Sequence, residues 1–148
     1  MLKRPLSPEQ RAKLTTSFPA DGDYLAEHLQ GALPAIALTG HLALSTAFLN
    51  DVAGDMVFAQ QVYGYAQPAD ALLAISTSGN SKNVLNAVKV AKALGVKTIG
   101  LTGQHGGQMN KLCDVVVRVP ASEVYVIQEY HLPVYHTLCR MLEIEFFG

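Results

Sequence analysis

The sequence predicts an α/β fold in which helices cover both faces of a parallel sheet, giving a three-layer sandwich. Two observations support this prediction. Apolar runs of strand length alternate with segments of helical periodicity, and they lie at residues 35–38, 71–75, 97–102 and 115–119. The run at 71–75 is continuously apolar, which is typical of a strand buried on both faces. Right-handed crossovers between such strands place helices on both faces of the sheet.

The predicted helices follow from apolar spacing and from residues that begin or end helices. Ser7 followed by Pro8 is typical of a helix start, and Gly95 is typical of the residue after a helix. Further helices are predicted over residues 24–29, 42–50, 56–63, 81–94 and 123–146. The polar, proline-broken residues 1–32 are predicted to form an N-terminal arm or lid, and residues 33–148 the main domain.

Composition limits the classes of function. The chain has 148 residues, which suggests one domain, and a net charge of −1 without a basic run disfavours a nucleic-acid binder. No apolar run approaches the length of a membrane span. Cys113 and Cys139 lack metal-ligand spacing and are poor candidates for a disulfide framework, so a reducing, cytoplasmic location is expected.

The most informative stretch is residues 76–81, which follow the apolar run 71–75 and precede a predicted helix. A strand, a small polar turn and a helix together expose backbone N–H groups at a helix N-terminus, where a phosphate binds well. The turn contains no Lys or Arg, so its phosphate ligands would be dipoles and hydroxyls, namely those of Ser76, Thr77, Ser78 and Ser81. The alternative is an ordinary strand-to-helix connection with a capping serine.

Two other polar segments are expected near the same edge of the sheet, because ligands bind outside the carboxyl ends of parallel strands. Residues 103–107 contain three glycines but match neither common nucleotide-binding pattern, so a flexible turn is favoured over a nucleotide loop and a NAD enzyme is disfavoured. Asn50 and Asp51 end a predicted helix. They could face a ligand or form an ordinary helix end and turn.

The final predicted helix contains the most reactive side chains. Gln128 and His136 lie about 80° apart around a helix, within one broad face, whereas His131 and His136 lie about 140° apart and could hardly bind one metal ion. Pro133 has no N–H for the carbonyl of Glu129, so a kink or a freed carbonyl is expected. His136 could carry a proton in catalysis or pack between helices, and His131 is expected to be structural.

Several motifs in order resemble the sugar isomerase (SIS) domain family, and within it the phosphoheptose isomerase branch. The resemblance covers residue 33 to the C-terminus. It rests on S-T-S-G-N-S at 76–81 with K-N-V-L-N-A after it, L-T-G-x-x-G-G at 101–107 and I-Q-E-x-H-L-P-x-Y-H at 127–136. It implies a flavodoxin-like α/β topology and a role in carbohydrate metabolism. The implied activity is aldose–ketose isomerisation of a phosphosugar such as sedoheptulose 7-phosphate.

The resemblance also assigns residues. It implies a catalytic role for His136 and substrate contacts from Asn50, Asp51, Ser76, Thr77, Ser78, Ser81 and Gln128. The family's G-N-G-G-S loop, its first strand and its His-x-x-x-Glu helix, which supplies a catalytic base and a metal ligand, are not found in this sequence. We therefore expect a sequence truncated at its N-terminus, with the second base coming from outside it.

The missing motif leaves the cofactor and the activity open. No tightly bound metal is expected, because two ligands hold zinc poorly, although Gln128 and His136 would be its ligands if zinc is present. The alternative to an isomerase is a non-catalytic phosphosugar-binding regulatory module, such as a partner of a replication initiator. The absence of the His-x-x-x-Glu helix from this sequence is compatible with both the isomerase and the binding module.

The chain is expected to form a homo-oligomer. Seven of the ten residues from 138 to 147 are apolar, and one sheet cannot cover them all because neighbouring residues point about 100° apart on a helix. The resemblance implies a tetramer with sites at subunit interfaces. No membrane or nucleic-acid partner is expected.

Overall fold

The computed structural model describes residues 4–148, so the first three residues of the predicted arm lie outside the described residues. The chain divides into two compact units. One unit is Ala37–Leu138, and the other contains the chain up to Ile36 together with Cys139–Gly148. We describe each unit by itself.

The larger unit is built on a parallel sheet, as predicted. Its strands are β1 (Ala71–Ile75), β2 (Lys97–Thr102) and β3 (Val115–Arg118), in the spatial order β1-β2-β3. Ala71 lies opposite Lys97, so β1 and β2 begin level with each other. Ile99 lies opposite Val115, so β3 begins two residues along β2. The carboxyl ends of all three strands therefore meet at one edge of the sheet.

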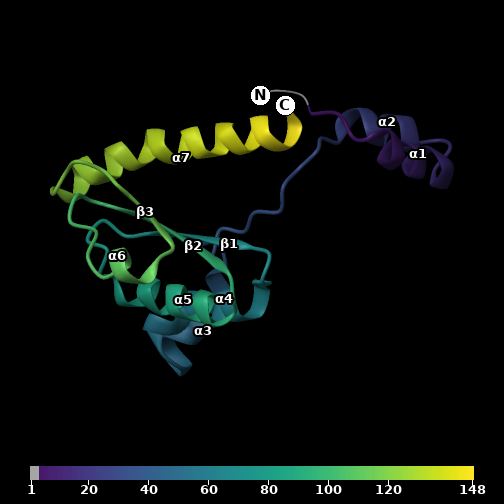
Figure 1. The fold of residues 1–148 in the computed structure, drawn as a ribbon. Helices are drawn as coiled ribbons and strands as arrows, with labels where there is room; N and C mark the ends of the chain where they lie inside the picture. The colour runs from purple at the N-terminus through teal and green to yellow at the C-terminus, as the bar shows by residue number, and fades with distance from the viewer. Residues whose placement is uncertain (1–3) are drawn as a thin grey trace. The chain divides into compact units, whose positions relative to one another are not determined.

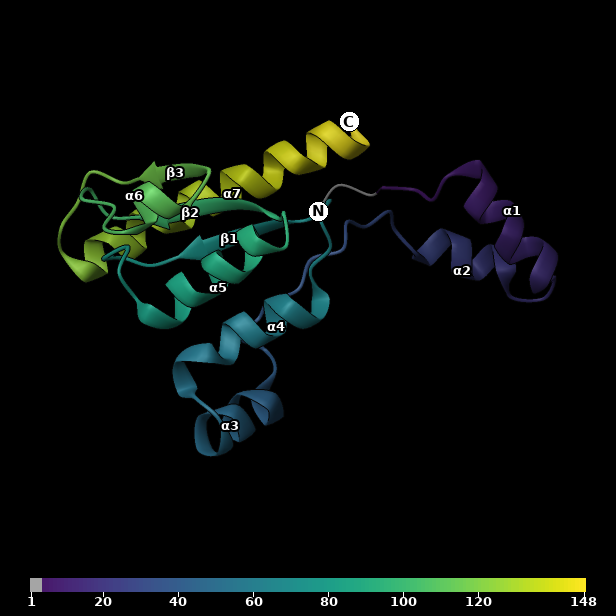
Figure 2. The same cartoon turned by 60° about the horizontal axis from the view of Figure 1, so that its bottom comes forward.

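Helices flank this sheet on both faces, which confirms the three-layer α/β architecture (Figure 1). Figures 1 and 2 show α5 on one face and α7 on the other. The helical elements are α3 (Leu42–Asp51), the 3₁₀ turn η1 (Gly54–Met56), α4 (Val57–Tyr65), α5 (Lys82–Ala93), α6 (Met109–Leu112) and α7 (Val124–Phe147).

The main core lies between the sheet and helices α4 and α5. Small and branched apolar side chains fill it in two adjoining clusters: Val62, Ala87, Ala91 and Val96 in one, and Ala74, Leu85, Val88 and Met109 in the other. Helix α5 contributes Leu85, Ala87, Val88 and Ala91 at helical spacing, so its apolar stripe is what fixes it to the sheet. Its N-terminus is thereby held at the end of β1.

The strand predicted at residues 35–38 is wrong. These residues adopt no regular structure, and Ile36 is exposed. Only Leu38 packs, as a partly buried side chain, against the cluster around Val62. An apolar run becomes a strand where a neighbouring strand accepts and donates its backbone hydrogen bonds, and the described sheet begins at β1.

The prediction that β1 is buried on both faces is also wrong for this chain. Ala74 is buried and Leu72 half-buried on the face toward α5, whereas Leu73 and Ile75 on the other face are 40% and 46% exposed. The reason is that β1 is an edge strand and nothing in the described chain covers that face of it. The continuous apolar run of β1 therefore includes side chains on a face of the sheet that is exposed to solvent in this single chain.

The smaller unit contains helices α1 (Pro8–Ser17) and α2 (Gly22–His28). The predicted start of α1 is confirmed, because the Ser7 hydroxyl accepts from the Gln10 N–H while the Gln10 side chain accepts from the Ser7 N–H. Within this unit the Arg4 guanidinium also donates to the carbonyl of Phe147, close to the C-terminus. The division of the chain at residue 33 stays a prediction.

Candidate functional site

Residues 76–81 form the turn between β1 and α5 at the carboxyl edge of the sheet, as predicted. Ser76 is buried, and its Oγ lies 2.9 Å from the Oγ of Ser81. The backbone N–H of Ser81 also points to Ser76 Oγ, at 3.4 Å. These contacts join the two ends of the turn. Ser78 and Ser81 are exposed and Thr77 is half-buried, so three hydroxyl-bearing residues can be reached from solvent.

Ser81 is the N-terminal cap residue of α5, yet its side chain makes no capping hydrogen bond within the described chain. The hydroxyl is paired with Ser76 instead. The interpretation of the turn as a simple capped connection requires that bond, so the geometry does not favour it. Helix α5 has 12 residues, and its first turn presents N–H groups and a positive dipole end toward the hydroxyls.

The nearest cation of the turn is already paired. Lys82, the first residue of α5, places its Nζ 2.6 Å from a carboxylate oxygen of Asp55. This side-chain hydrogen bond lowers the pKa of Asp55 and raises the pKa of Lys82. Residues 76–81 themselves contain no cation. A phosphate here would therefore be held mainly by N–H dipoles and hydroxyls.

The loop after β2 packs directly against this turn. The Gly103 N–H donates to the Thr77 carbonyl at 3.0 Å, and the Met109 N–H donates to the Gly79 carbonyl at 3.2 Å. Gly106 and Gly107 both have positive φ angles, of 69° and 51°, which suit glycine in a tight turn. The predicted convergence of these two loops is confirmed by these bonds.

Asn50 and Asp51 are the last two residues of α3, and both are exposed. No hydrogen bond joins either of them to the turn at 76–81 among residues 4–148. The segment just after them is tied to α5, because the Asn86 side chain donates to the Asp55 carbonyl at 3.1 Å. This contact could not be foreseen from sequence, since it spans 31 residues.

Gln128 and His136 are both exposed on α7. The ring of His136 packs edge-on against Tyr135, with centroids 5.0 Å apart, and the described chain does not bury it between helices. His131 is different: it is only 4% exposed, and its Nε2 has no hydrogen-bond partner among the described residues. The structure thus separates an accessible imidazole from a buried one.

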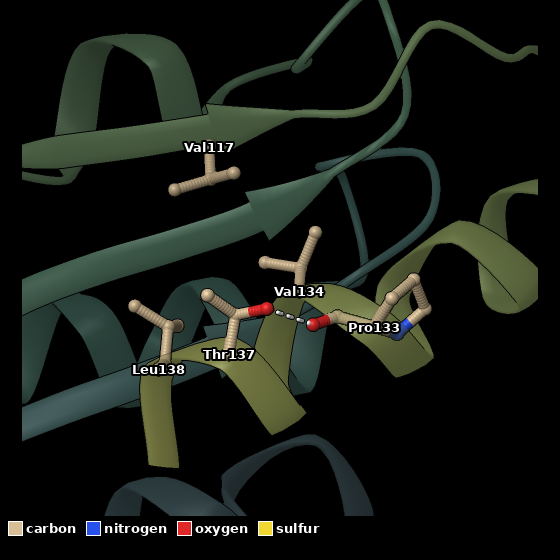
Figure 3. Close-up of a pocket in the computed structure, with 5 residues that line it drawn as sticks. All are labelled: Val117, Pro133, Val134, Thr137 and Leu138. Carbon is tan, nitrogen blue, oxygen red and sulfur yellow. Dashed lines mark hydrogen bonds between the residues drawn. The ribbon is translucent and has the colours of Figure 1, made fainter. Parts of the chain in front are cut away.

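Helix α7 continues through Pro133. The Thr137 hydroxyl donates to the Pro133 carbonyl at 2.8 Å, as Figure 3 shows. An open hollow of about 320 Å³ lies between this part of α7 and β3, lined by Val117, Pro133, Val134, Thr137 and Leu138. Its lining is almost wholly apolar and has no charged group, so it does not suit a sugar phosphate.

The described residues do not assemble a metal centre. No group of three or more His, Cys, Asp or Glu residues close enough to bind a metal occurs among residues 4–148. Gln128 and His136 would be two ligands, fewer than the protein ligands of a zinc site, so we derive no step through a metal. Helices that are long and apolar enough to cross a membrane are likewise not found in the described part of the chain.

The parallel α/β fold and the hydroxyl turn at its carboxyl edge are typical of a class of phosphate-binding α/β domains, and comparison with known proteins identifies the family. The sequence model of the SIS domain matches residues 23–103. Phosphoheptose isomerase from Aliarcobacter butzleri is 47% identical over 133 residues, which are 85% of this chain and 70% of that protein. The enzyme of the same name from Rhodospirillum rubrum is 44% identical over 131 residues, 84% of this chain and 70% of that protein.

Solved structures agree. The phosphoheptose isomerase of Neisseria gonorrhoeae superposes with a TM-score of 0.73 at 39% identity, over 75% of this chain and 62% of that one. That of Francisella tularensis also gives 0.73, at 36% identity, over 91% of this chain and 69% of that one. The chain belongs to the SIS domain family, among the phosphoheptose isomerases, and the resemblance of its motifs is confirmed. It spans about two thirds of the length of these relatives.

Proposed function

We propose that this chain acts as a sedoheptulose 7-phosphate isomerase, which interconverts a ketose phosphate and the corresponding aldose phosphate. The observation that supports this most directly is the turn at 76–81. There a helix N-terminus whose cap residue, Ser81, makes no capping bond meets reachable hydroxyls at the carboxyl edge of a parallel sheet. The identity of the chain to phosphoheptose isomerases supplies the reaction class.

In this proposal the turn holds the phosphate. The N–H groups at the start of α5 and the hydroxyls of Thr77, Ser78 and Ser81 donate to its oxygens, while Ser76 holds Ser81 in place. Hydrogen bonds to a charged acceptor are stronger than those between neutral groups. Anchoring the phosphate, which does not react, fixes the sugar chain so that its C1–C2 end reaches the reacting groups.

The isomerisation moves two protons. A base removes a proton from C1 of the ketose to give an enediol, and a proton is then delivered to C2, while the proton on O1 moves to O2. We assign one of these transfers to His136, whose imidazole is accessible, because histidine is the side chain that most often transfers protons in enzymes. The base for the other transfer lies outside the residues that we assign.

Sugar contacts from Asn50, Asp51 and Gln128 are part of the same proposal. All three side chains are exposed in the single chain, which leaves them free for a ligand or for a neighbouring copy. We further propose a homotetramer in the cytoplasm. Its support is the exposed apolar side chains along α7, among them Leu132, Met141, Leu142, Ile144 and Phe146.

The proposal is tested by incubating the full chain with sedoheptulose 7-phosphate and following formation of the aldose phosphate. We expect turnover, and a loss of about 100-fold or more in kcat for His136→Ala, the usual effect of removing a general acid–base group. His28→Ala, which changes an exposed histidine on α2, is the matched control. Binding without turnover would contradict the isomerase and favour a non-catalytic phosphosugar-binding module.

A further inference from the structure

We propose that Asn80 is a positioning residue, which clamps the turn at 76–81 to the loop after β2 and so sets the shape of the phosphate site. This inference rests on the proposed function, because it assumes that the turn binds a phosphate. Asn80 is not itself assigned a contact with the ligand. Its role is to hold the groups that make one.

The clamp consists of three hydrogen bonds. Asn80 Oδ1 accepts from the backbone N–H of Gln108 at 3.0 Å, and Asn80 Nδ2 donates to the carbonyl of Ser78 at 3.1 Å. The Asn80 N–H also donates to Ser78 Oγ at 3.1 Å. Both ends of the amide are therefore in use, one on each loop, and the network fixes which end is oxygen.

Close packing of the two loops supports the same conclusion. A Cβ on Gly79 would lie 2.1 Å from the carbonyl oxygen of Gly106, and one on Gly107 would lie 2.5 Å from the carbonyl oxygen of Ser78 and 2.7 Å from Asn80 Nδ2. Such distances are impossible for real Cβ atoms, so glycine is required at both positions. The turn at 76–81 and the loop after β2 are therefore in direct backbone contact next to Asn80.

The consequence concerns the order of the turn before ligand binds. Ser78 accepts two of the three bonds, on its hydroxyl and its carbonyl, so the clamp orients an exposed part of the turn. Without the Gln108 bond, these residues would have to become ordered when the phosphate binds, which weakens affinity. Asn80 thus contributes to affinity without touching the ligand.

The test uses Asn80→Ala in the full chain, with sedoheptulose 7-phosphate and inorganic phosphate as probes in calorimetric titrations. We expect both to bind about tenfold more weakly, as the loss of one or two ordering hydrogen bonds implies. The matched control is Gln60→Ala, which removes an exposed amide side chain from α4, away from both loops. The control should bind both probes like the wild type.

A second variant separates positioning from general stability. Gly107→Ala forces a Cβ against the same clamp from the other loop. Gly107→Ala should weaken phosphate binding. The double variant Asn80→Ala/Gly107→Ala should bind phosphate no more weakly than the weaker of the two single variants, because both changes disrupt the same contact between the loops. A purely structural role predicts lowered thermal stability with unchanged affinity well below the melting temperature.

The outcomes distinguish the two proposals. If Ser81→Ala weakens binding of both probes while Asn80→Ala binds like the wild type, the clamp is refuted and the phosphate site stands. If the wild-type chain binds neither probe, the proposed function fails and the clamp fails with it. The clamp is supported if Asn80→Ala loses affinity equally for inorganic phosphate and for the sugar phosphate. It also requires that the losses of the two single variants do not add in the double variant.

Discussion

At the scale of single residues, the hydroxyl turn owes its geometry to contacts among its own side chains. Ser76 is buried and contacts Ser81, so we expect the two serines to act as a pair rather than as independent phosphate ligands. Ser78 is exposed and is oriented by Asn80. Each hydroxyl therefore has distinct surroundings, which the sequence S-T-S-G-N-S alone does not reveal.

Replacing Ser76, Ser78 and Ser81 by Ala should weaken binding of sedoheptulose 7-phosphate by well over tenfold. Each hydrogen bond to a charged group contributes about 1.5–3 kcal/mol, and two of the three hydroxyls are reachable. The fold should survive, because the core between the sheet and α5 is apolar. Calorimetry measures the affinity and circular dichroism the fold. Wild-type affinity in the triple variant would mean that the ligand binds elsewhere.

Asp114 shows how one carboxylate joins two strands. Its oxygens accept from the Thr98 N–H at 2.8 Å, the Thr98 hydroxyl at 2.9 Å and the Lys92 ammonium at 2.9 Å. These bonds, with that from Lys92 the largest contribution, hold the pKa of Asp114 well below its usual value of 3.8. The ionised form is thus favoured in the folded chain, close to the start of β3.

Because its folded pKa is lowered, Asp114 stabilises the fold above its ordinary pKa, and this contribution is lost as the pH falls below it. Asp114→Asn should therefore be less stable than the wild type at pH 7 in urea unfolding. The difference between the two should shrink as the pH falls below about 3.8, where the unfolded carboxyl begins to bind a proton. A difference that stays constant down to pH 2 would contradict this account.

At the scale of elements, the sequence predicted helices better than strand partners. Periodicity, the cap at Ser7 and the glycine at 95 located every helix longer than four residues. The run at 35–38 was mistaken for a strand because apolarity says nothing about whether a neighbouring strand is present. The clamp by Asn80 was also missed, since its bond to Gln108 spans 28 residues. Long-range contacts of this kind leave no local signal.

Gly95 provides a test of the end of α5. Its φ angle is +76°, and a Cβ there would meet nothing within 4 Å, so strain alone decides the effect of Gly95→Ala. We expect a loss of about 1 kcal/mol in the free energy of unfolding. Gly64→Ala in α4 is the control: it also has open space but no positive φ, and should be neutral or slightly stabilising. Equal effects of the two changes would contradict the assignment of the cap.

At the scale of the whole molecule, the exposed apolar surface is the main feature to explain. The open face of β1 presents Leu73 and Ile75, and α7 presents Ile144 and Phe146 among its exposed residues. A soluble chain rarely leaves so much apolar area in water. Both surfaces are therefore candidates for burial in the homo-oligomer that we propose.

We expect light scattering to show an oligomer, a tetramer under the proposal, at micromolar concentration. Ile144→Glu should shift the chain toward smaller species, because it places a charge among apolar side chains, and Ile144 is 54% exposed in the single chain. Lys89→Glu on the exposed surface of α5 controls for a change of charge and should leave the mass unchanged. A stable monomer in the wild type would refute the tetramer.

The central claim is that residues 76–81 and the start of α5 hold the phosphate of a sugar. The most direct measurement is a titration of the ¹⁵N-labelled chain with sedoheptulose 7-phosphate, followed by the backbone amide signals. The account predicts saturable shifts at residues 76–83 and, through the clamp, at 103–109, with little change along α1. Shifts confined to other parts of the chain, or no saturable shifts at all, would contradict it.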